Sequence, residues 1–297
     1  MAENTKKELV SKKYKKRSTF GEIWHHMSQN KGAMVGLAIL VFLAFCAFGS
    51  ELFLDYETDV IGRNLAERFQ GPSSKHLFGT DQMGRDILAR LLYGSRFSLS
   101  VGFVAVVIAL FFGVTLGAFA GYYGGRVEDV IMRGTDIFAS VPAMLMAICI
   151  VSALGANTIN LMISVGITSV PSFVRITRAS VLTVRNQEFV EAARAIGRSE
   201  PAIIFGHVLP NGLSPVIVQT TMRIGSSIIS ASSLSFLGLG VPAPDPEWGT
   251  MLSDGRQYIR TAPHMTLFPG LAIMITVLSF NMLGDALRDA LDPKLKK

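Results

Sequence analysis

The sequence predicts an all-α membrane protein, a polytopic bundle of six transmembrane helices with both termini in the cytoplasm. Hydrophobic residues make up 49% of the 297 residues and charged residues only 17%, against about 25% charged in soluble domains. The apolar residues gather in runs of about 20 residues, which cross a bilayer core as helices. Lys and Arg are more than twice as frequent in the segments that this topology places inside as in those outside, which sets the orientation.

The N-terminal segment, residues 1–32, is predicted to be a cytoplasmic basic tail followed by an interfacial amphipathic helix. Residues 1–17 are polar and Lys-rich, so we expect no packed core there. Thr19 and Glu22 then have the spacing of a helix capping box. The apolar residues of this helix share one face: Phe20, Ile23, Trp24 and Met27. Such a helix suits the membrane interface, and an ordinary helix packed on protein is the alternative.

Six apolar runs define a transmembrane domain over residues 33–285. The predicted spans are 33–53, 97–122, 130–154, 158–176, 213–234 and 265–283. Only Gly155-Ala156-Asn157 separates the third run from the fourth, so these two spans should be antiparallel neighbours. Several runs contain a proline, which removes a backbone donor and can kink a helix: Pro142, Pro171, Pro215 and Pro269.

The segments between the runs differ in character. Two are predicted to be extracytoplasmic loops, residues 51–96 and 236–264, and the first of them should end in a short amphipathic helix over residues 86–96. A polar cytoplasmic loop covers residues 177–210, and residues 286–297 form a cytoplasmic C-terminal tail. Both cysteines, Cys46 and Cys149, lie inside apolar runs far from any His cluster, so a disulfide framework and a zinc site are not expected.

Several chemistries are excluded by what the chain lacks. It has no Gly-rich phosphate loop with its Lys, and no Lys at all between Lys75 and Lys294, so it cannot hydrolyse ATP by itself. Neither a zinc-protease motif nor a nucleophile elbow occurs. The net charge of +6 is concentrated at the chain ends without aromatic interleaving, which argues against nucleic-acid binding. We therefore expect a chain that is not an enzyme and binds no cofactor.

The cytoplasmic loop has the pattern of a docking element. Asn186 is a candidate N-cap, and acidic residues follow it in the first turn, where the helix dipole favours them. Gly197 is placed to stop this helix, and Leu209-Pro210 should end a second one that begins at 199–201. A small apolar face is predicted from Phe189, Ala192, Ala193 and Ile196. A loop that simply lies on the membrane is the alternative.

Glu191-Ala192-Ala193-x-x-x-Gly197, followed by Leu209-Pro210, resembles the EAA signature of ABC importer permeases. That family usually has Ile where this chain has His207. The resemblance implies that the 186–210 loop is the coupling helix, which sits in a groove of an ATPase subunit. The coupling residues that it implies are Glu191, Ala192, Ala193, Arg194, Gly197, Leu209 and Pro210.

Three further motifs resemble the C-type permease of dipeptide and oligopeptide importers, the peptide–nickel family. They are Phe78-Gly79-Thr80-Asp81-x-x-Gly84-Arg85-Asp86 with Tyr93-Gly94-x-Arg96-x-Ser98-Leu99, Leu234-Ser235-Phe236-Leu237-Gly238-Leu239-Gly240, and Pro246-Glu247-Trp248-Gly249. The resemblance implies a multi-pass protein of the cytoplasmic (inner) membrane that moves di- or oligopeptides. It implies a second homologous permease, two ATP-binding cassette ATPases that hold ATP and Mg, and an extracytoplasmic substrate-binding protein. Nickel, a metal chelate or glutathione is the alternative cargo.

Among the charged residues that fall within the apolar runs, two bear on the transport path, Arg223 and Asp136. An Arg near the centre of a span must face the bundle interior or a wet cavity, because lipid exposure is costly. Arg223 could line the translocation path and meet a substrate carboxylate, pair with Asp136 or a partner subunit, or reach toward the bilayer surface. A self-contained secondary transporter is a more distant possibility, since it would need inverted repeats and midplane acids, and Asp136 is the only candidate acid.

Overall fold

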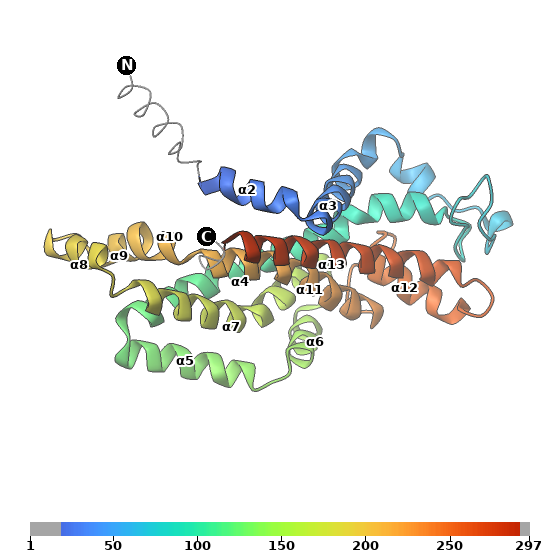
Figure 1. Ribbon diagram of the computed structural model, residues 1–297. Helices are drawn as coiled ribbons and strands as arrows, with labels where there is room; N and C mark the ends of the chain where they lie inside the picture. The colour runs from blue at the N-terminus through green and yellow to red at the C-terminus, as the bar shows by residue number, and fades with distance from the viewer. Residues whose placement is uncertain (1–18, 292–297) are drawn as a thin grey trace, which may run out of the picture.

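The computed structural model describes residues 19–291, without the side chains of Thr19 and Phe20. The predicted tail at 1–17 lies outside this range, as does the end of the C-terminal tail. The described chain is helical throughout its membrane domain (Figure 1). Its long elements are α2 (Thr19–Gln29), α3 (Lys31–Gly49), α4 (Ile87–Tyr123), α5 (Gly125–Ala139), α6 (Ala143–Leu154), α7 (Thr158–Val184), α11 (Ser214–Phe236) and α13 (His264–Leu291). The shorter α-helices are α8 (Glu188–Ala195), α9 (Glu200–Ile203), α10 (Leu209–Gly212) and α12 (Trp248–Gly255). Short 3₁₀ or π turns are η1 (Ser50–Leu52), η2 (Tyr56–Val60), η3 (Leu65–Glu67), η4 (Ile204–Val208) and η5 (Arg256–Tyr258).

Four of these helices, within the part of the chain that is described, are long and apolar enough to cross a membrane unbroken. They are α3 with η1, α4, α7 and α13. Two further spans exist only as bent pairs, α5 with α6 at 83° and 200–212 with α11 at 69°. Counting each bent pair once gives up to 6 spans, which agrees with the predicted polytopic bundle.

Two predicted spans are built differently in the structure. The amphipathic 86–96 helix and the second span are one continuous helix, the 37-residue α4. Residues 130–154, predicted as one span, are broken between Ala139 and Ala143. Pro142 stands at this break with an extended backbone, and a proline disfavours helical geometry at the residue before it. The helix therefore ends at Ala139 and restarts at Ala143 in a new direction.

The centre of the bundle is the contact between α4 and α7, which glycines make close. Gly113, Gly117 and Gly121 recur every four residues and face α7. A Cβ atom on Gly117 would lie 2.6 Å from the carbonyl oxygen of Val174, closer than atoms can approach. Small residues at this spacing let membrane helices pack backbone against backbone, so α4 and α7 form a rigid pair.

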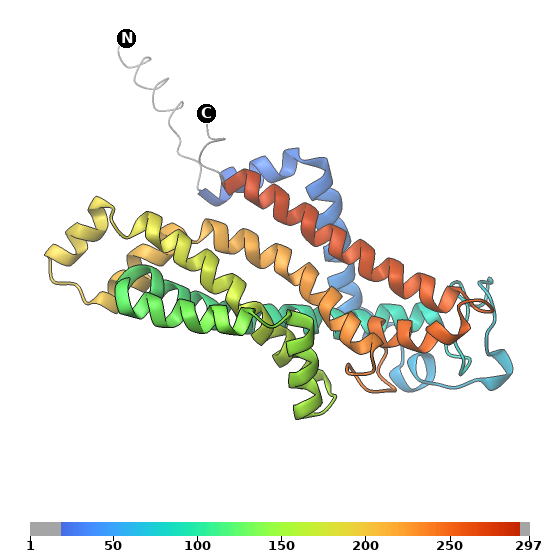
Figure 2. The ribbon, with the colours of Figure 1, turned by 90° about the horizontal axis from the view of Figure 1, so that it is seen from below.

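The two ends of the bundle carry different segments (Figures 1 and 2). The helices α8, α9 and α10 lie at one end, and the start of α2 and the end of α13 lie toward that same side. Residues 51–86 and α12 lie at the opposite end. An even number of spans requires both chain ends on one side, so the arrangement is consistent with the expected topology.

The predicted interfacial helix α2 packs on protein along one face. Met27 is 7% exposed and contacts α13 and the start of α3 together with Ile23. Trp24, at the edge of the same face, is 47% exposed. Of the two interpretations, packing on protein thus accounts for the buried part of this face, and the placement of α2 at the membrane interface stays a prediction.

Candidate functional site

The predicted docking helix exists as α8, and its stop signal is confirmed. Gly197 has φ +77°, a conformation that glycine adopts without strain. Its N–H bonds to the carbonyl of Arg194 at 3.0 Å, and the N–H of Arg198 bonds to the carbonyl of Ala193 at 3.2 Å. This pair of bonds is a Schellman motif. The N-cap residue is Gln187, without a side-chain capping bond, so the prediction of Asn186 as N-cap is wrong.

The second helix of the loop begins as predicted and ends later than predicted. Ser199 caps it and Pro201 lies in its first turn, where a missing N–H costs nothing. The helix continues through the π turn η4 into α10 and ends at Gly212. The Leu209 N–H donates to the Ile204 carbonyl in the π register. Pro210 therefore falls in the first turn of α10, where a missing N–H is tolerated. Leu209-Pro210 therefore does not end the helix.

The loop packs tightly against the ends of α4 and α7. The contact is a cluster of buried apolar residues: Ala118, Tyr122, Val181, Val184, Val190, Ala193, Ile203, Ile204, Val208 and Leu209. Burial of this many apolar side chains holds α8 to α10 in place as one body. The 188–212 segment is thus an extension of the bundle.

What the packing leaves free is one face of α8. Glu188, Glu191 and Ala192 are exposed, and Ile196 is 80% exposed. The predicted apolar face is therefore divided, because Ala193 turns inward and the others turn outward. An exposed small residue beside an exposed Ile at a helix tip is a surface on which another protein can seat closely.

Arg194 ties this helix to the end of α4. Its Nη2 donates to the Tyr122 phenol oxygen at 3.0 Å, and its guanidinium lies 5.8 Å from the Tyr122 ring centroid. Glu200 of α9 lies 3.8 Å away. The hydrogen bond to Tyr122 and the nearby carboxylates raise the pKa of Arg194, so its positive charge is secure. Sequence reasoning included Arg194 and missed Tyr122, because only the fold brings α4 beside α8.

The residue that departs from the family pattern has a partner of its own. Arg198 Nη1 lies 2.9 Å from His207 Nε2, and because an arginine only donates, His207 accepts there. The side-chain amide of Asn211 donates to the His207 carbonyl at 2.7 Å. His207 therefore braces the Gly197 turn from η4.

Behind the loop, a cavity of about 630 Å³ opens between α7, α11 and the α5–α6 break. Its polar wall holds Ser172 and Arg175 of α7 with Gln219 and Arg223 of α11. Gln219 donates to Ser172 at 3.0 Å across the two helices. Apolar residues form the facing wall: Phe138, Ala139, Val141, Pro142, Ala143 and Met146.

The structure separates the two charged residues that were predicted as a pair. Asp136 of α5 bonds to Arg175 of α7 at 2.8 Å, so it is not the partner of Arg223. Arg223 faces the cavity, and its side chain makes no hydrogen bond or ion pair within residues 19–291. Sequence reasoning placed Arg175 at a helix end and missed its place in this wall, since α7 runs on to Val184.

The motifs of the 78–86 region build the opposite end of the bundle. Asp81 accepts from Arg85 Nε at 2.6 Å, and Arg90 Nε lies 3.7 Å from the same carboxylate oxygen. Both arginines are buried, with 4% and 2% exposure. Asp86 caps α4 through a 2.9 Å bond from the Ala89 N–H. Buried charges need such pairing, so these residues fasten the 51–86 segment to α4.

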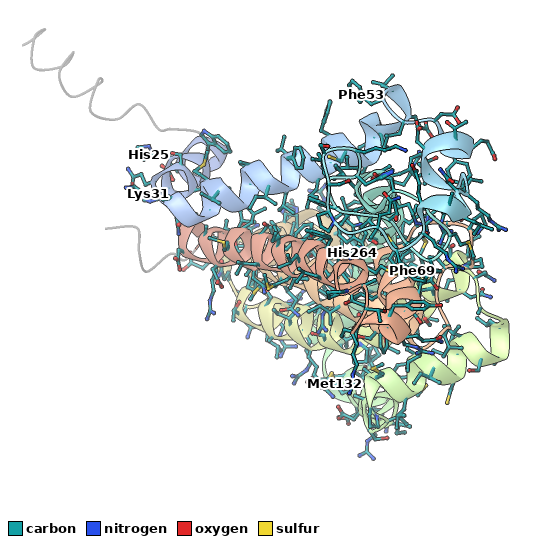
Figure 3. All side chains as sticks on the ribbon, turned by 90° about the vertical axis from the view of Figure 1, so that its right-hand side faces the viewer. His25, Lys31, Phe53, Phe69, Met132 and His264 are labelled. Atoms are coloured by element: carbon teal, nitrogen blue, oxygen red, sulfur yellow. The ribbon has the colours of Figure 1, made fainter. Side chains whose placement is uncertain are left out.

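The Pro-Glu-Trp-Gly motif makes the matching fastening from the other long loop. Glu247 caps α12 and accepts from Ser98 of α4 at 3.3 Å, while Trp248 donates to the Leu91 carbonyl at 3.0 Å. His264 lies 3.1 Å from the Thr80 carbonyl, and Figure 3, which looks at this end, labels His264 and Phe69 there. The motifs therefore have a structural role: they hold the two long loops against α4 at this end of the bundle.

Comparison with known proteins places the chain in a family. Residues 113–297 match the binding-protein-dependent transport system inner membrane component, and residues 18–72 match the N-terminal TM domain of oligopeptide transport permease C. The dipeptide transport system permease protein DppC of Alkalihalophilus pseudofirmus is 49% identical, with 94% of this chain and 91% of the relative covered. The glutathione transport system permease protein GsiD of Pectobacterium atrosepticum is 42% identical, with 94% and 93% covered. The di/tripeptide transport system permease protein DppC of Pseudomonas aeruginosa is 43% identical, with 94% and 93% covered.

A solved structure shares the fold. A chain of the MetNI methionine ABC transporter in an inward-facing conformation superposes with TM-score 0.56 at 16% identity, covering 68% of this chain and 97% of that one. The likeness supports the helical membrane architecture alone. The sequence matches show which family the chain belongs to. A component of a binding-protein-dependent ABC transport system works with a binding protein and an ATPase. The chain belongs to the binding-protein-dependent transport system inner membrane component family, as a permease subunit of an ABC importer that performs no catalysis of its own.

Proposed function

We propose that this chain moves di- or oligopeptides across the cytoplasmic membrane, as one of two homologous permease subunits working with two ATPases and an extracytoplasmic binding protein. The observation that carries the substrate class is the 49% identity to a dipeptide permease along 94% of the chain. Two relatives at 42% and 43% identity, for glutathione and for di- and tripeptides, are named for molecules that share a peptide backbone.

The coupling surface is the exposed face of α8, with Glu191, Ala192 and Ile196 at the contact with the ATPase. Arg194, Gly197 and Leu209 hold that face in shape, through the bond to Tyr122, the Schellman turn and burial in the loop cluster. Pro210 is exposed in the first turn of α10. An ATPase that moves α8 would therefore also move the ends of α4 and α7, since all three share one apolar cluster.

The translocation path runs along the cavity wall that carries Arg223. Asp136 contributes indirectly, because it binds Arg175 of that wall at 2.8 Å. A second permease facing this wall would close the cavity into a passage, and alternating closure at its two ends would move the cargo.

Reconstitution tests the proposed function. The permease pair with its ATPases is placed in liposomes with the binding protein outside and ATP inside, and uptake of a labelled dipeptide is measured. ATP-dependent uptake that needs all subunits is the expected result. Uptake by this chain alone would refute the proposal and favour a secondary transporter.

Glutathione is the second candidate cargo, favoured by relatives such as GsiD. Competition decides between the two. Unlabelled dipeptide should abolish uptake of the labelled dipeptide, while glutathione and nickel ions at the same concentration leave it unchanged. Competition by glutathione at equal or lower concentration would assign the transporter to that tripeptide instead.

A further inference from the structure

The cavity behind the loop has an uneven distribution of charge. Two arginines line it, Arg175 and Arg223, and no described Asp or Glu is among its lining residues. Arg175 is balanced by Asp136 at 2.8 Å. Arg223 is the cation of this wall that the described chain leaves without a counter-charge.

Such a residue has an energetic consequence. The Nε atom of Arg223 is buried and has no hydrogen-bond partner within the part of the chain described. An uncompensated cation inside a membrane bundle costs several kcal/mol relative to a paired one. A favourable position for an anion therefore exists beside Arg223, which lines the open cavity.

The surrounding groups define the kind of anion. Gln219 stands one helical turn before Arg223 on α11, so both side chains project from the same face. Gln219 already donates to Ser172 at 3.0 Å, which keeps its amide aligned with the wall. A planar guanidinium with its fork of N–H donors matches a carboxylate in two parallel bonds. The rest of the lining is largely apolar and includes Phe138 of α5 and Met146 of α6.

We propose that this cavity receives the carboxylate end of the transported peptide, with Arg223 as its direct contact. The inference rests on the proposed peptide function and adds the orientation of the cargo. The lining of this chain offers the ammonium end no carboxylate. The amino end therefore points away from this chain, toward the second permease.

A cysteine reporter measures the charge preference directly. Cys46 and Cys149 are replaced by Ala, Gln219→Cys is introduced, and the assembled complex in detergent is labelled with methanethiosulfonate reagents of opposite charge. The anionic reagent should react about tenfold faster than the cationic one, after correction for their rates with a free thiol. Arg223→Gln should bring the two rates together, and Arg223→Lys should keep the difference. A charge preference that does not change on Arg223→Gln would overturn the proposal.

Protection by ligand tests the orientation. Millimolar dipeptide should slow labelling of Gln219→Cys, and the same dipeptide with an amidated C-terminus should not. Equal protection by acid and amide would overturn the carboxylate contact. If Arg223 instead pairs permanently with an acid of the second permease, the cationic reagent should react faster once Arg223→Gln is made, which would also overturn it.

Transport completes the test and separates the two proposals. Arg223→Gln in the full complex should lower the kcat/KM of dipeptide uptake at least about tenfold, with part restored by Arg223→Lys. The binding protein is a different chain, so its affinity for peptide stays unchanged. Normal uptake by Arg223→Gln would overturn this inference and leave the peptide function intact. A complex that imports no peptide, yet shows the anion preference, would refute the peptide function instead.

Discussion

Arg194 of the exposed helix α8 donates to the phenol oxygen of Tyr122, the penultimate residue of α4, over 3.0 Å. The guanidinium also faces the Tyr122 ring at 5.8 Å from its centroid, within the range of a cation–π contact. This relationship joins the surface proposed for the ATPase to the longest membrane helix of the chain. In the proposed coupling, this contact would carry motion of the loop to the bundle.

Tyr122→Phe should weaken coupling while leaving the fold intact. The substitution removes the acceptor of Arg194 and keeps the ring in the apolar cluster. We expect the complex to hydrolyse ATP near the normal rate and to transport several-fold less peptide per ATP, because a charge-assisted bond is lost at the junction. Parallel assays of phosphate release and peptide uptake in liposomes measure this ratio.

The neighbouring tyrosine is the matched control. Tyr123 is 47% exposed, and Tyr123→Phe should leave the ratio of uptake to ATP hydrolysis unchanged. A normal ratio in Tyr122→Phe would show that this bond takes no part in coupling.

Ile196→Asp should detach the ATPase without unfolding the permease. Ile196 is 80% exposed at the tip of α8, so the free permease loses little when it is replaced. A carboxylate there would be buried without a partner in a docked complex, at a cost of several kcal/mol. Affinity purification through this chain should then recover the second permease and no ATPase.

Ile259→Asp provides the comparison for that experiment. Ile259 is 58% exposed near the opposite end of the bundle, and its replacement should leave recovery of the ATPase unaltered. Full recovery of the ATPase with Ile196→Asp would place the docking surface elsewhere.

Gly117→Ala should destabilise the bundle at the contact of α4 with α7. The added Cβ would meet the Val174 carbonyl at 2.6 Å, and forcing atoms into a packed interior costs typically about 1–3 kcal/mol. Gly134→Ala is the control, since its Cβ would meet nothing within 4 Å. Thermal unfolding in detergent should show a lower Tm for Gly117→Ala and no loss for Gly134→Ala. Equal Tm values would mean that α4 and α7 separate more easily than their packing implies.

Asp81→Asn should be strongly destabilising at the other end of the molecule. Arg85 and Arg90 are buried around this carboxylate, and removing one member of a buried charge cluster costs about 3–5 kcal/mol. The Tm of the purified complex should fall clearly, whereas Glu57→Gln at an exposed position of η2 should leave it in place. An unchanged Tm for Asp81→Asn would mean that Asp254, 3.9 Å from Arg85, suffices as counter-charge.

Local signals in the sequence predicted the elements that depend on few neighbours. Gly197 stops α8 because its own backbone adopts φ +77°, and the next helix starts after Ser199 with Pro201 in its first turn, where a missing N–H is tolerated. Composition was enough to locate the membrane segments. The break near Pro142 was flagged by its proline, but its angle of 83° depends on how α6 packs on α7, which no local rule contains.

For the same reason, some residues of the candidate site could be predicted from the sequence and others could not. Glu191 to Gly197 form one short helix and its stop, so their neighbourhood is readable along the chain. The ion-pair partner of Asp136 could not be predicted from the sequence, because Arg175 lies 39 positions away on another helix. Nothing in the sequence around Tyr122 marks it as part of the site. Its contact with Arg194 forms only because the end of α4 lies beside α8.

The sequence by itself determined that this is a multi-helix membrane protein with a polar loop helix, because hydrophobic run length and charge placement are properties of the chain alone. Its motifs added the resemblance to importer permeases. Only the tertiary structure decided that Ala193 faces inward while Ile196 faces outward, that Arg175 is neutralised, and that Arg223 faces a cavity without a counter-charge from the described residues. Each of these depends on which groups from distant helices come within a few ångströms. In a bilayer that distance decides whether a charge is paired or left for a ligand.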